Sequence, residues 1–204
     1  MLKNVIFDCG GVVCAYDPQW LMRQYFVESE IPIVQEPIYR DWQSLDAGTA
    51  DYDEYVRDTL AMLPEALREP CARFFEGWYQ IMPPIEDVWA MIARLKARGY
   101  GVYLLSNAPT VYVDSIQRNY PIIRAMDGVV ISAPLKMVKP NAEIFEYALN
   151  TYRLKAEECL FVDDIAVNVE GARRAGLNGF VFSGDVEPLW REIERLGGGR
   201  EEAR

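Results

Sequence analysis

Short apolar runs alternate with stretches of helical periodicity along most of the chain. Each run is too short for a helix and is bounded by polar or turn-forming residues, which favours a β-strand. The strands predicted in this way are Asn4–Phe7, Gly101–Leu105, Gly128–Ile131, Cys159–Val162 and Gly179–Phe182.

Helical patterns fill much of the space between these strands. Within Ile85–Arg98, apolar residues recur at three- and four-residue spacing, and Gly99 follows as a C-terminal cap. Asn141–Tyr152 and Val167–Ala175 show the same pattern. Strands that alternate with helices are typical of an α/β fold with a parallel sheet covered by helices on both faces. We assign residues 1–14 and 85–196 to this core.

Residues 15–84 break the alternation and have only helical patterns. Asp17 followed by Pro18 is a typical helix start, and further helices are expected at Asp51–Met62 and Glu65–Tyr79. The sequence therefore predicts a small all-helical cap inserted after the first strand. Residues 197–204 form a polar C-terminal tail that we expect to be frayed.

The chain is acidic, and its charge limits the partners that it can bind. It has 204 residues with 21 Lys and Arg against 31 Asp and Glu, which gives a net charge of −10. Nucleic acids and anionic membranes would repel such a surface. No apolar run is long enough to span a bilayer, and the N-terminus does not read as a secretory signal. We expect a soluble cytoplasmic protein, whose oligomeric state the sequence leaves open.

The chain contains no histidine, which excludes several classes of enzyme. Catalysis by Ser-His-Asp or Cys-His groups and zinc sites built on histidine are ruled out within this chain. Proton transfer near neutral pH must then come from carboxyl, Lys, Tyr or Cys groups. The cysteines form no CxxC pair, and we expect all of them to be buried, reduced and structural: Cys9, Cys14, Cys71 and Cys159.

Polar residues that could take part in catalysis or ligand binding follow three of the predicted strands. In an open parallel sheet, ligands bind at the carboxyl ends of the strands. Carboxylates there could hold Mg²⁺, which prefers oxygen ligands, while a lysine, a hydroxyl and the backbone amides of Cys9-Gly10-Gly11 could hold a phosphate. Each residue alone has a simpler explanation, and Asn168 in particular is expected at the surface or in a cap. Their order along the chain and their placement after the strands together indicate one site, formed by Asp8, Ser106, Asn107, Lys139, Asp163 and Asp164.

Four segments together resemble the four motifs of the haloacid dehalogenase (HAD) superfamily of hydrolases. They are FDCGGVV, LLSNAP, VKPNAEIFEYAL and FVDDIAVN, and the helical insert lies where that superfamily has its cap. The first and fourth are most similar to the branch with glucose-1-phosphatase-like enzymes and the phosphatase domain of soluble epoxide hydrolase. The resemblance implies a Rossmann-like core and an enzyme that hydrolyses a small phosphorylated metabolite with Mg²⁺.

The resemblance also implies a role for each matching position. Asp8 would be the nucleophile, forming an aspartyl-phosphate, and also a metal ligand, with Lys139 beside it as a catalytic residue. The other metal ligands would be Asp164, the Gly10 carbonyl and Asp163, the last in direct or indirect contact. Phosphate oxygens would be held by Cys9, Gly10, Ser106, Asn107 and Lys139.

Position 10 departs from the pattern of most phosphatases in the superfamily. They carry a second aspartate two residues after the nucleophile as general acid and base, and here that position is Gly10. A substrate with an easy leaving group, such as an anomeric sugar phosphate, would need little protonation. Alternatively, another carboxylate such as Asp17 could substitute, although an N-cap explains Asp17 better. A left-handed backbone at Gly10 would be a reason for glycine there.

Two other functions stay open. A metal-independent 2-haloacid dehalogenase would also lack the second aspartate, but a metal-free site gains nothing from the Asp163-Asp164 pair. A catalytically weak binding protein on the same fold is the other alternative. Substrate choice is expected to lie in the cap, where several residues could reach over the site or simply pack inside the cap: Tyr16, Tyr39, Trp42, Asp46 and the turn at Gly48.

Overall fold

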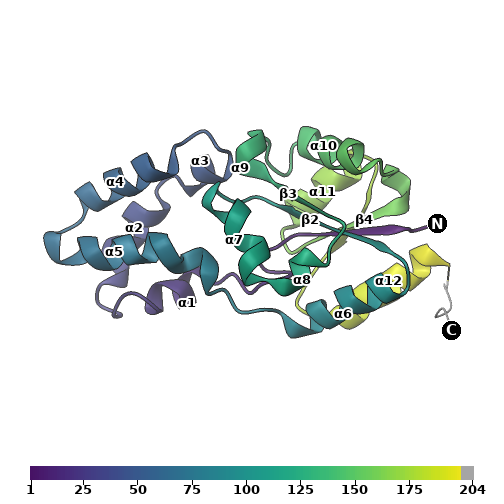
Figure 1. The fold of residues 1–204 in the computed structure, drawn as a ribbon, viewed down its shortest axis with the longest axis horizontal. Helices are drawn as coiled ribbons and strands as arrows, with labels where there is room; N and C mark the ends of the chain where they lie inside the picture. The colour runs from purple at the N-terminus through teal and green to yellow at the C-terminus, as the bar shows by residue number, and fades with distance from the viewer. Residues whose placement is uncertain (199–204) are drawn as a thin grey trace.

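The computed structural model describes residues 1–198, and a parallel β-sheet lies at the centre of that part of the chain (Figure 1). The strand order is β3-β2-β1-β4-β5, and all neighbours run parallel. The strands are β1 (Asn4–Phe7), β2 (Gly101–Ser106), β3 (Gly128–Ile131), β4 (Cys159–Asp163) and β5 (Asn178–Val181). The predicted α/β class is confirmed. The prediction ended β2 and β4 one residue early and placed β5 one residue late.

Both faces of the sheet are buried, and alternate residues of each strand enter different cores. In β1, Val5 and Phe7 belong to one hydrophobic cluster, whereas Ile6 belongs to the other. In β4, Val162 and Phe161 divide in the same way. Side chains of a strand alternate between faces, so a strand that is covered on both sides must be apolar throughout. This requirement explains the unbroken apolar runs in the sequence.

Helices cover both faces of the sheet, as Figure 1 shows. On one face α6 packs on β2 and against α12, and on the other α11 packs on β4 and β5. The sequence patterns predicted α6, α10 and α11 to within a residue or two at each end, but not α7, α8, α9 or α12. The bounds are α6 (Glu86–Ala97), α7 (Val111–Asn119), α8 (Pro121–Arg124), α9 (Ser132–Leu135), α10 (Ala142–Tyr152), η2 (Ala156–Glu158), α11 (Ala166–Arg174) and α12 (Val186–Gly197).

The helical insertion after β1 is also confirmed, and its helices lie beyond one end of the sheet (Figure 1). It contains α1 (Pro18–Arg23), α2 (Ile31–Tyr39), α3 (Trp42–Asp46), α4 (Tyr52–Met62), α5 (Glu65–Gly77) and η1 (Trp78–Gln80). Its interior is aromatic, with Phe75 in ring contact with Trp42, Tyr52 and Tyr55. Such rings bury large apolar areas, which helps a small unit to form its own core.

Two neighbouring linkers join the cap to the sheet. Ala15 donates to the Pro83 carbonyl at 2.8 Å, and Ile85 donates to the Val13 carbonyl at 3.1 Å. The Trp89 indole of α6 donates to the same Val13 carbonyl at 2.9 Å. The segments that lead into and out of the helical insertion are therefore hydrogen-bonded to each other.

The limits predicted for the core, residues 1–14 and 85–196, and for the cap, residues 15–84, stay a prediction. Of the predicted tail, Gly197 is the last residue of α12 and Gly198 caps it with a left-handed backbone. The remaining tail residues lie outside the described part of the chain. Within residues 1–198, no helix combines the length and the apolar character that crossing a membrane requires.

The contact between α11 and the loop before α10 can be tested with Gly171→Ala. An added Cβ would lie 2.4 Å from the Pro140 carbonyl oxygen, next to Lys139. Alanine normally stabilises a helix interior by up to about 1 kcal/mol, but overpacking costs about 1–3 kcal/mol. We therefore expect a net loss of stability in urea unfolding. The exposed neighbour Glu170→Ala should change it much less, and a Gly171→Ala protein as stable as wild type would contradict this packing.

Candidate active site

The first strand ends at Asp8, and a tight loop then turns the chain away from the sheet. The Cys9 carbonyl accepts hydrogen bonds from the amides of Val13 and Cys14 at 2.8 and 2.9 Å. Gly11, not Gly10, has the left-handed backbone of this loop, with φ of 78°. The proposed conformational reason for glycine at position 10 is therefore wrong. The loop leaves the Asp8 carboxylate at the carboxyl end of β1.

A buried lysine joins the two strand ends in the middle of the sheet. Lys139 Nζ lies 2.6 Å from Asp8 Oδ1 and 2.7 Å from Asp163 Oδ2. All three side chains are buried. Since β1 and β4 are neighbours, Asp8 and Asp163 must emerge side by side, and one cation between them offsets their charges. The predicted grouping of these residues is observed.

The Asn107 side chain holds the lysine in place. Its amide nitrogen donates to the Lys139 carbonyl at 3.0 Å, and its oxygen accepts from the Lys139 amide at 2.9 Å. This pair of bonds fixes the Lys139 backbone against the end of β2. The Asn107 side chain therefore positions the lysine, and its own hydrogen-bonding groups are occupied by the Lys139 backbone. Ser106, the last residue of β2, precedes Asn107 and is also buried.

Asn168 was expected at the surface or in a cap, but its side chain is buried against Asp163. Its amide nitrogen lies 3.2 and 3.1 Å from the two carboxylate oxygens of Asp163. The Ile165 amide also donates to Asp163, at 2.8 Å. The sequence pattern could not reveal this because only the turn after β4 folds Asn168 back onto Asp163. Asp163 is thus held by three partners, including Lys139.

Asp164 is exposed and completes a group of three carboxylates. One oxygen each from Asp8, Asp163 and Asp164 lie within 4.8 Å of one another. A Cβ at Gly11 would lie only 2.4 Å from Asp164 Oδ2, so glycine is required for this approach. Oxygen donors at this spacing suit a hard divalent cation such as Mg²⁺. The donor set therefore fits the predicted metal.

Burial and neighbouring charges shift the protonation of this group. Burial raises the pKa of Asp8 to about 6, an effect that Lys139 opposes and Asp163 reinforces. Burial alone would lower the pKa of Lys139, but the two carboxylates outweigh it and raise the pKa. Burial and Asp163 also raise the pKa of Asp164. The carboxylates repel one another, which is the electrostatic condition under which a cation is bound.

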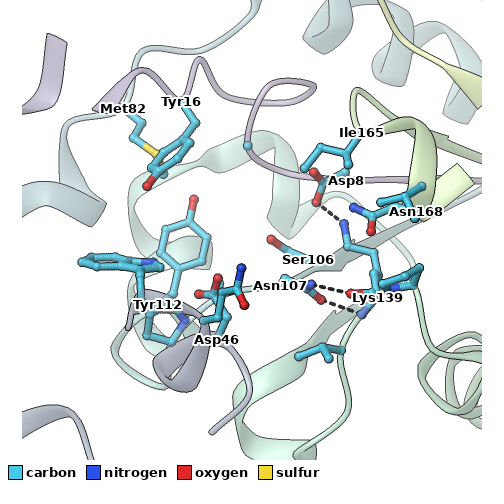
Figure 2. Close-up of a pocket in the computed structure, with 18 of the residues that line it drawn as sticks. Asp8, Tyr16, Asp46, Met82, Ser106, Asn107, Tyr112, Lys139, Ile165 and Asn168 are labelled. Atoms are coloured by element: carbon cyan, nitrogen blue, oxygen red, sulfur yellow. Dashed lines mark hydrogen bonds and ion pairs between the residues drawn. The ribbon is translucent and has the colours of Figure 1, made fainter. Parts of the chain in front are cut away.

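The site opens into a cavity of about 580 Å³ between the sheet and the cap (Figure 2). Asp8, Ser106, Asn107 and Lys139 line it from the core side. Tyr16 lies over the loop after β1, and the aromatic residues Trp42, Trp78 and Tyr112 form much of the remaining wall with Met82, Ile165 and Val167. This volume suits a metabolite-sized molecule. The predicted cap residues Tyr16, Trp42 and Asp46 reach the cavity.

Three other predicted residues have different positions. The Cys9 thiol is buried 3.3 Å from the Tyr112 hydroxyl, so only the Cys9 backbone could face a phosphate. Gly10 lines the cavity with its backbone. Tyr39 packs on Trp42, with ring centroids 5.1 Å apart, and belongs to the interior of the cap. As expected, all four cysteines are buried and free.

The chain is similar to phosphatases and to dehalogenases. It is 24% identical to a sesquiterpene phosphatase of Aspergillus oryzae over 87% of this chain and 88% of that protein. It is 25% identical to an (S)-2-haloacid dehalogenase of Pseudomonas putida, over 96% of this chain and 95% of that protein. Among solved structures, a HAD family enzyme of Bacteroides thetaiotaomicron in complex with magnesium and inorganic phosphate has a TM-score of 0.72 at 20% identity. That match covers 94% of this chain and all of the other.

The HAD motifs, the parallel sheet and the cap agree with a direct family match. Residues 2–176 match the family described as haloacid dehalogenase-like hydrolase, a range that runs from β1 to the end of α11. The branch within the superfamily that the sequence resembles is not decided by this match. The chain belongs to the haloacid dehalogenase-like hydrolase family.

Proposed function

We propose that this hydrolase is a Mg²⁺-dependent phosphatase that cleaves a small phosphorylated metabolite through an aspartyl-phosphate. The observation that carries the proposal is the Asp8 carboxylate, held by Lys139 beside Asp163 at the mouth of the cavity. Asp164 brings a third carboxylate to the same place. A nucleophile, a cation-binding group and space for a metabolite thus occur together.

Each site residue has a proposed role. The metal would be held by Asp8, the Gly10 carbonyl and Asp164, with Asp163 in direct or indirect contact. The phosphate oxygens would be held by Ser106, Lys139 and the backbone amides of Cys9, Gly10 and Asn107. When bound, Mg²⁺ supplies positive charge that offsets the charge of the phosphoryl group.

The chain's own residues can carry the two chemical steps. A carboxylate oxygen of Asp8 forms a bond to phosphorus, and the bond to the leaving oxygen breaks. Water then attacks the phosphorus of the aspartyl-phosphate, the bond to Asp8 breaks, and inorganic phosphate leaves. Lys139 keeps the nucleophile ionised and neutralises charge as it builds up, without moving.

The aromatic wall of the cavity supports a substrate with a carbon body that can contact rings. Trp42, Trp78 and Tyr112 offer apolar faces, and such faces accept both the C–H faces of a sugar and a hydrocarbon chain. A sugar phosphate is one candidate within this class. An apolar organic phosphate is another, and a substrate panel should include both.

Two observations bear on a dehalogenase function. Gly10 and the resemblance to the Pseudomonas putida enzyme are compatible with it. However, Lys139 offsets only part of the charge of three carboxylates, which repel an anionic substrate unless a further cation is bound. This repulsion favours the phosphatase over the dehalogenase. The retained cluster of Asp8, Lys139 and Asp163 likewise weighs against a protein that only binds.

Hydrolysis should depend on the metal. With 4-nitrophenyl phosphate as a general substrate, removal of Mg²⁺ by EDTA should lower the rate at least about 100-fold, because the metal contributes several kcal/mol. Excess Mg²⁺ should restore it. Halide release from a 2-haloacid is measured in parallel. Undiminished phosphatase activity in EDTA, or metal-independent halide release without phosphate hydrolysis, would exclude the proposed function.

Asp8→Asn should abolish turnover and keep the fold. The amide cannot form the phosphoryl bond, so we expect a loss of at least about 1,000-fold. Because Asp163 still pairs with Lys139, circular dichroism and thermal melting should remain close to wild type. Asp87→Asn, at an exposed position of α6, is the control. Substantial residual activity in Asp8→Asn would rule out the covalent route.

Lys139→Met should destabilise the protein as well as inactivate it. The change leaves the carboxylates of Asp8 and Asp163 buried without a cation, which costs about 3–5 kcal/mol for a buried pair. Urea unfolding of the metal-free protein measures this loss. Lys3→Met removes an exposed ion pair with Glu158 and should have a much smaller effect. Equal effects of the two substitutions would contradict the buried ion pairs.

A further inference from the structure

The structure shows what occupies the place of the missing second aspartate. A side chain at position 10 would start 3.2 Å from Tyr16 Cβ, so Tyr16 packs where that side chain would begin. The Tyr16 ring lines the cavity (Figure 2). A side chain at position 10 would thus be in tight contact with Tyr16, and with glycine there the loop after β1 supplies no acid from that position.

Asp17, the substitute considered from the sequence, has another function. Its carboxylate accepts from the amides of Gln19 and Trp20 at 2.9 and 3.1 Å and caps α1. It is exposed and does not line the cavity. The N-cap explanation is thus confirmed, and the acid must be sought elsewhere.

Asp46 brings a carboxyl group into the cavity from the cap. Among the described residues that line this cavity, Asp8 and Asp46 are the only acids. Figure 2 shows Asp46 near Tyr112 and on the side of Ser106 and Asn107, where the phosphate is proposed to bind. Asp46 also interacts electrostatically with Lys139 and Asp8 across the cavity. The Asp46 side chain therefore shares the cavity with the proposed reaction centre and enters it from the cap.

The core holds Asp46 in place through its backbone. The buried Ser132 hydroxyl at the end of β3 donates to the Asp46 carbonyl at 2.5 Å. Two residues later, Gly48 turns with φ of 65°, and a Cβ there would lie 2.0 Å from the Ala133 carbonyl oxygen. The end of α3 is thus seated on α9 of the core, as Figure 1 also shows. This seating gives the side chain a defined position before substrate binds.

The environment of Asp46 allows it to give and accept a proton near neutral pH. Burial raises its pKa to about 7, an effect that Lys139 opposes and Asp8 reinforces. The indole of Trp42 contributes a hydrogen bond to the ionised form, and the Tyr16 hydroxyl interacts electrostatically with Asp46. A general acid and base is most effective when its pKa is near the working pH.

We propose that Asp46 is the catalytic acid and base that replaces the aspartate missing at position 10. The inference rests on the phosphatase function proposed above. In the first step, Asp8 attacks phosphorus while the Asp46 carboxyl group gives its proton to the leaving oxygen and becomes a carboxylate. In the second step, that carboxylate takes a proton from the attacking water as phosphate leaves Asp8. Asp46 ends protonated, so the cycle closes with no other reactant.

The test compares Asp46→Asn with Asp17→Asn on two leaving groups. Nitrophenolate leaves without a proton, whereas an alkoxide needs one. For Asp46→Asn, kcat/KM for an alkyl phosphate should fall by about 10²–10⁴-fold, and that for 4-nitrophenyl phosphate by less than about tenfold. Asp17→Asn keeps a good N-cap and should match wild type on both. Equal losses of kcat/KM on both substrates would mean a structural role for Asp46 and overturn the proposal.

Two further measurements separate catalysis from folding. Asp46→Asn should release a burst of nitrophenolate equal to the enzyme concentration and then turn over slowly, because the base for the second step is missing. In wild type, kcat/KM for the alkyl phosphate should fall as the pH rises above about 7 and Asp46 loses its proton, and this fall should disappear in Asp46→Asn. Steady turnover without a burst, or an unchanged pH profile, would contradict the assignment.

Failure of this proposal can be distinguished from failure of the proposed function. A wild-type protein that hydrolyses no phosphate ester with Mg²⁺ would overturn both. A wild-type protein with Mg²⁺-dependent activity that Asp8→Asn abolishes and Asp46→Asn leaves unchanged on the alkyl phosphate would overturn only the role of Asp46.

Discussion

The site depends on one ammonium group placed between two carboxylates. Lys139 contacts both Asp8 and Asp163 where all three side chains are largely buried, and the desolvation of three charges is offset only if they pair closely. Adjacent parallel strands bring the two acids together, and Asn107 holds the lysine backbone against a third strand. The strand order thus determines which charges meet at the site, because it places β1 and β4 side by side.

The cap completes the cavity and adds what the core lacks. The core contributes the charged groups and the ends of the strands, whereas the cap contributes aromatic surface and the Asp46 carboxyl group. The Asp46 carbonyl accepts a hydrogen bond from Ser132, and Gly48 packs closely against Ala133. These contacts with the core fix the backbone of Asp46. In the proposed mechanism, the cap residues that line the cavity would both contact the substrate and supply the proton. Tyr16 packs closely over Gly10, where the second aspartate of related phosphatases would begin.

Much of this fold could be predicted from the sequence because its strands are buried on both faces. Continuous apolar runs such as Cys159–Val162 are distinctive, and each ends at a polar residue. The Asp17-Pro18 start was equally clear, because capping is a local interaction. By contrast, α12 was not predicted, although the N-cap at Asp185 and the helical spacing of its apolar residues are local signals. Asn168 was expected at the surface or in a cap, whereas its side chain is buried against Asp163. The burial of Asn168 depends on which segment packs against which, and local pattern does not contain that information.

By itself, the sequence determined the α/β class, the helical insertion and the identities of the charged residues at the strand ends. These follow from periodicity, capping and the spacing of polar residues, all of which act over a few positions. The tertiary structure alone decided that Asn107 clamps Lys139, that Asn168 supports Asp163, and that Asp46 shares a cavity with Asp8. Asp46 and Lys139 are far apart in the chain, and only the packing of cap on core brings them near. Contacts of this kind depend on three-dimensional distance, which no local pattern of side chains encodes.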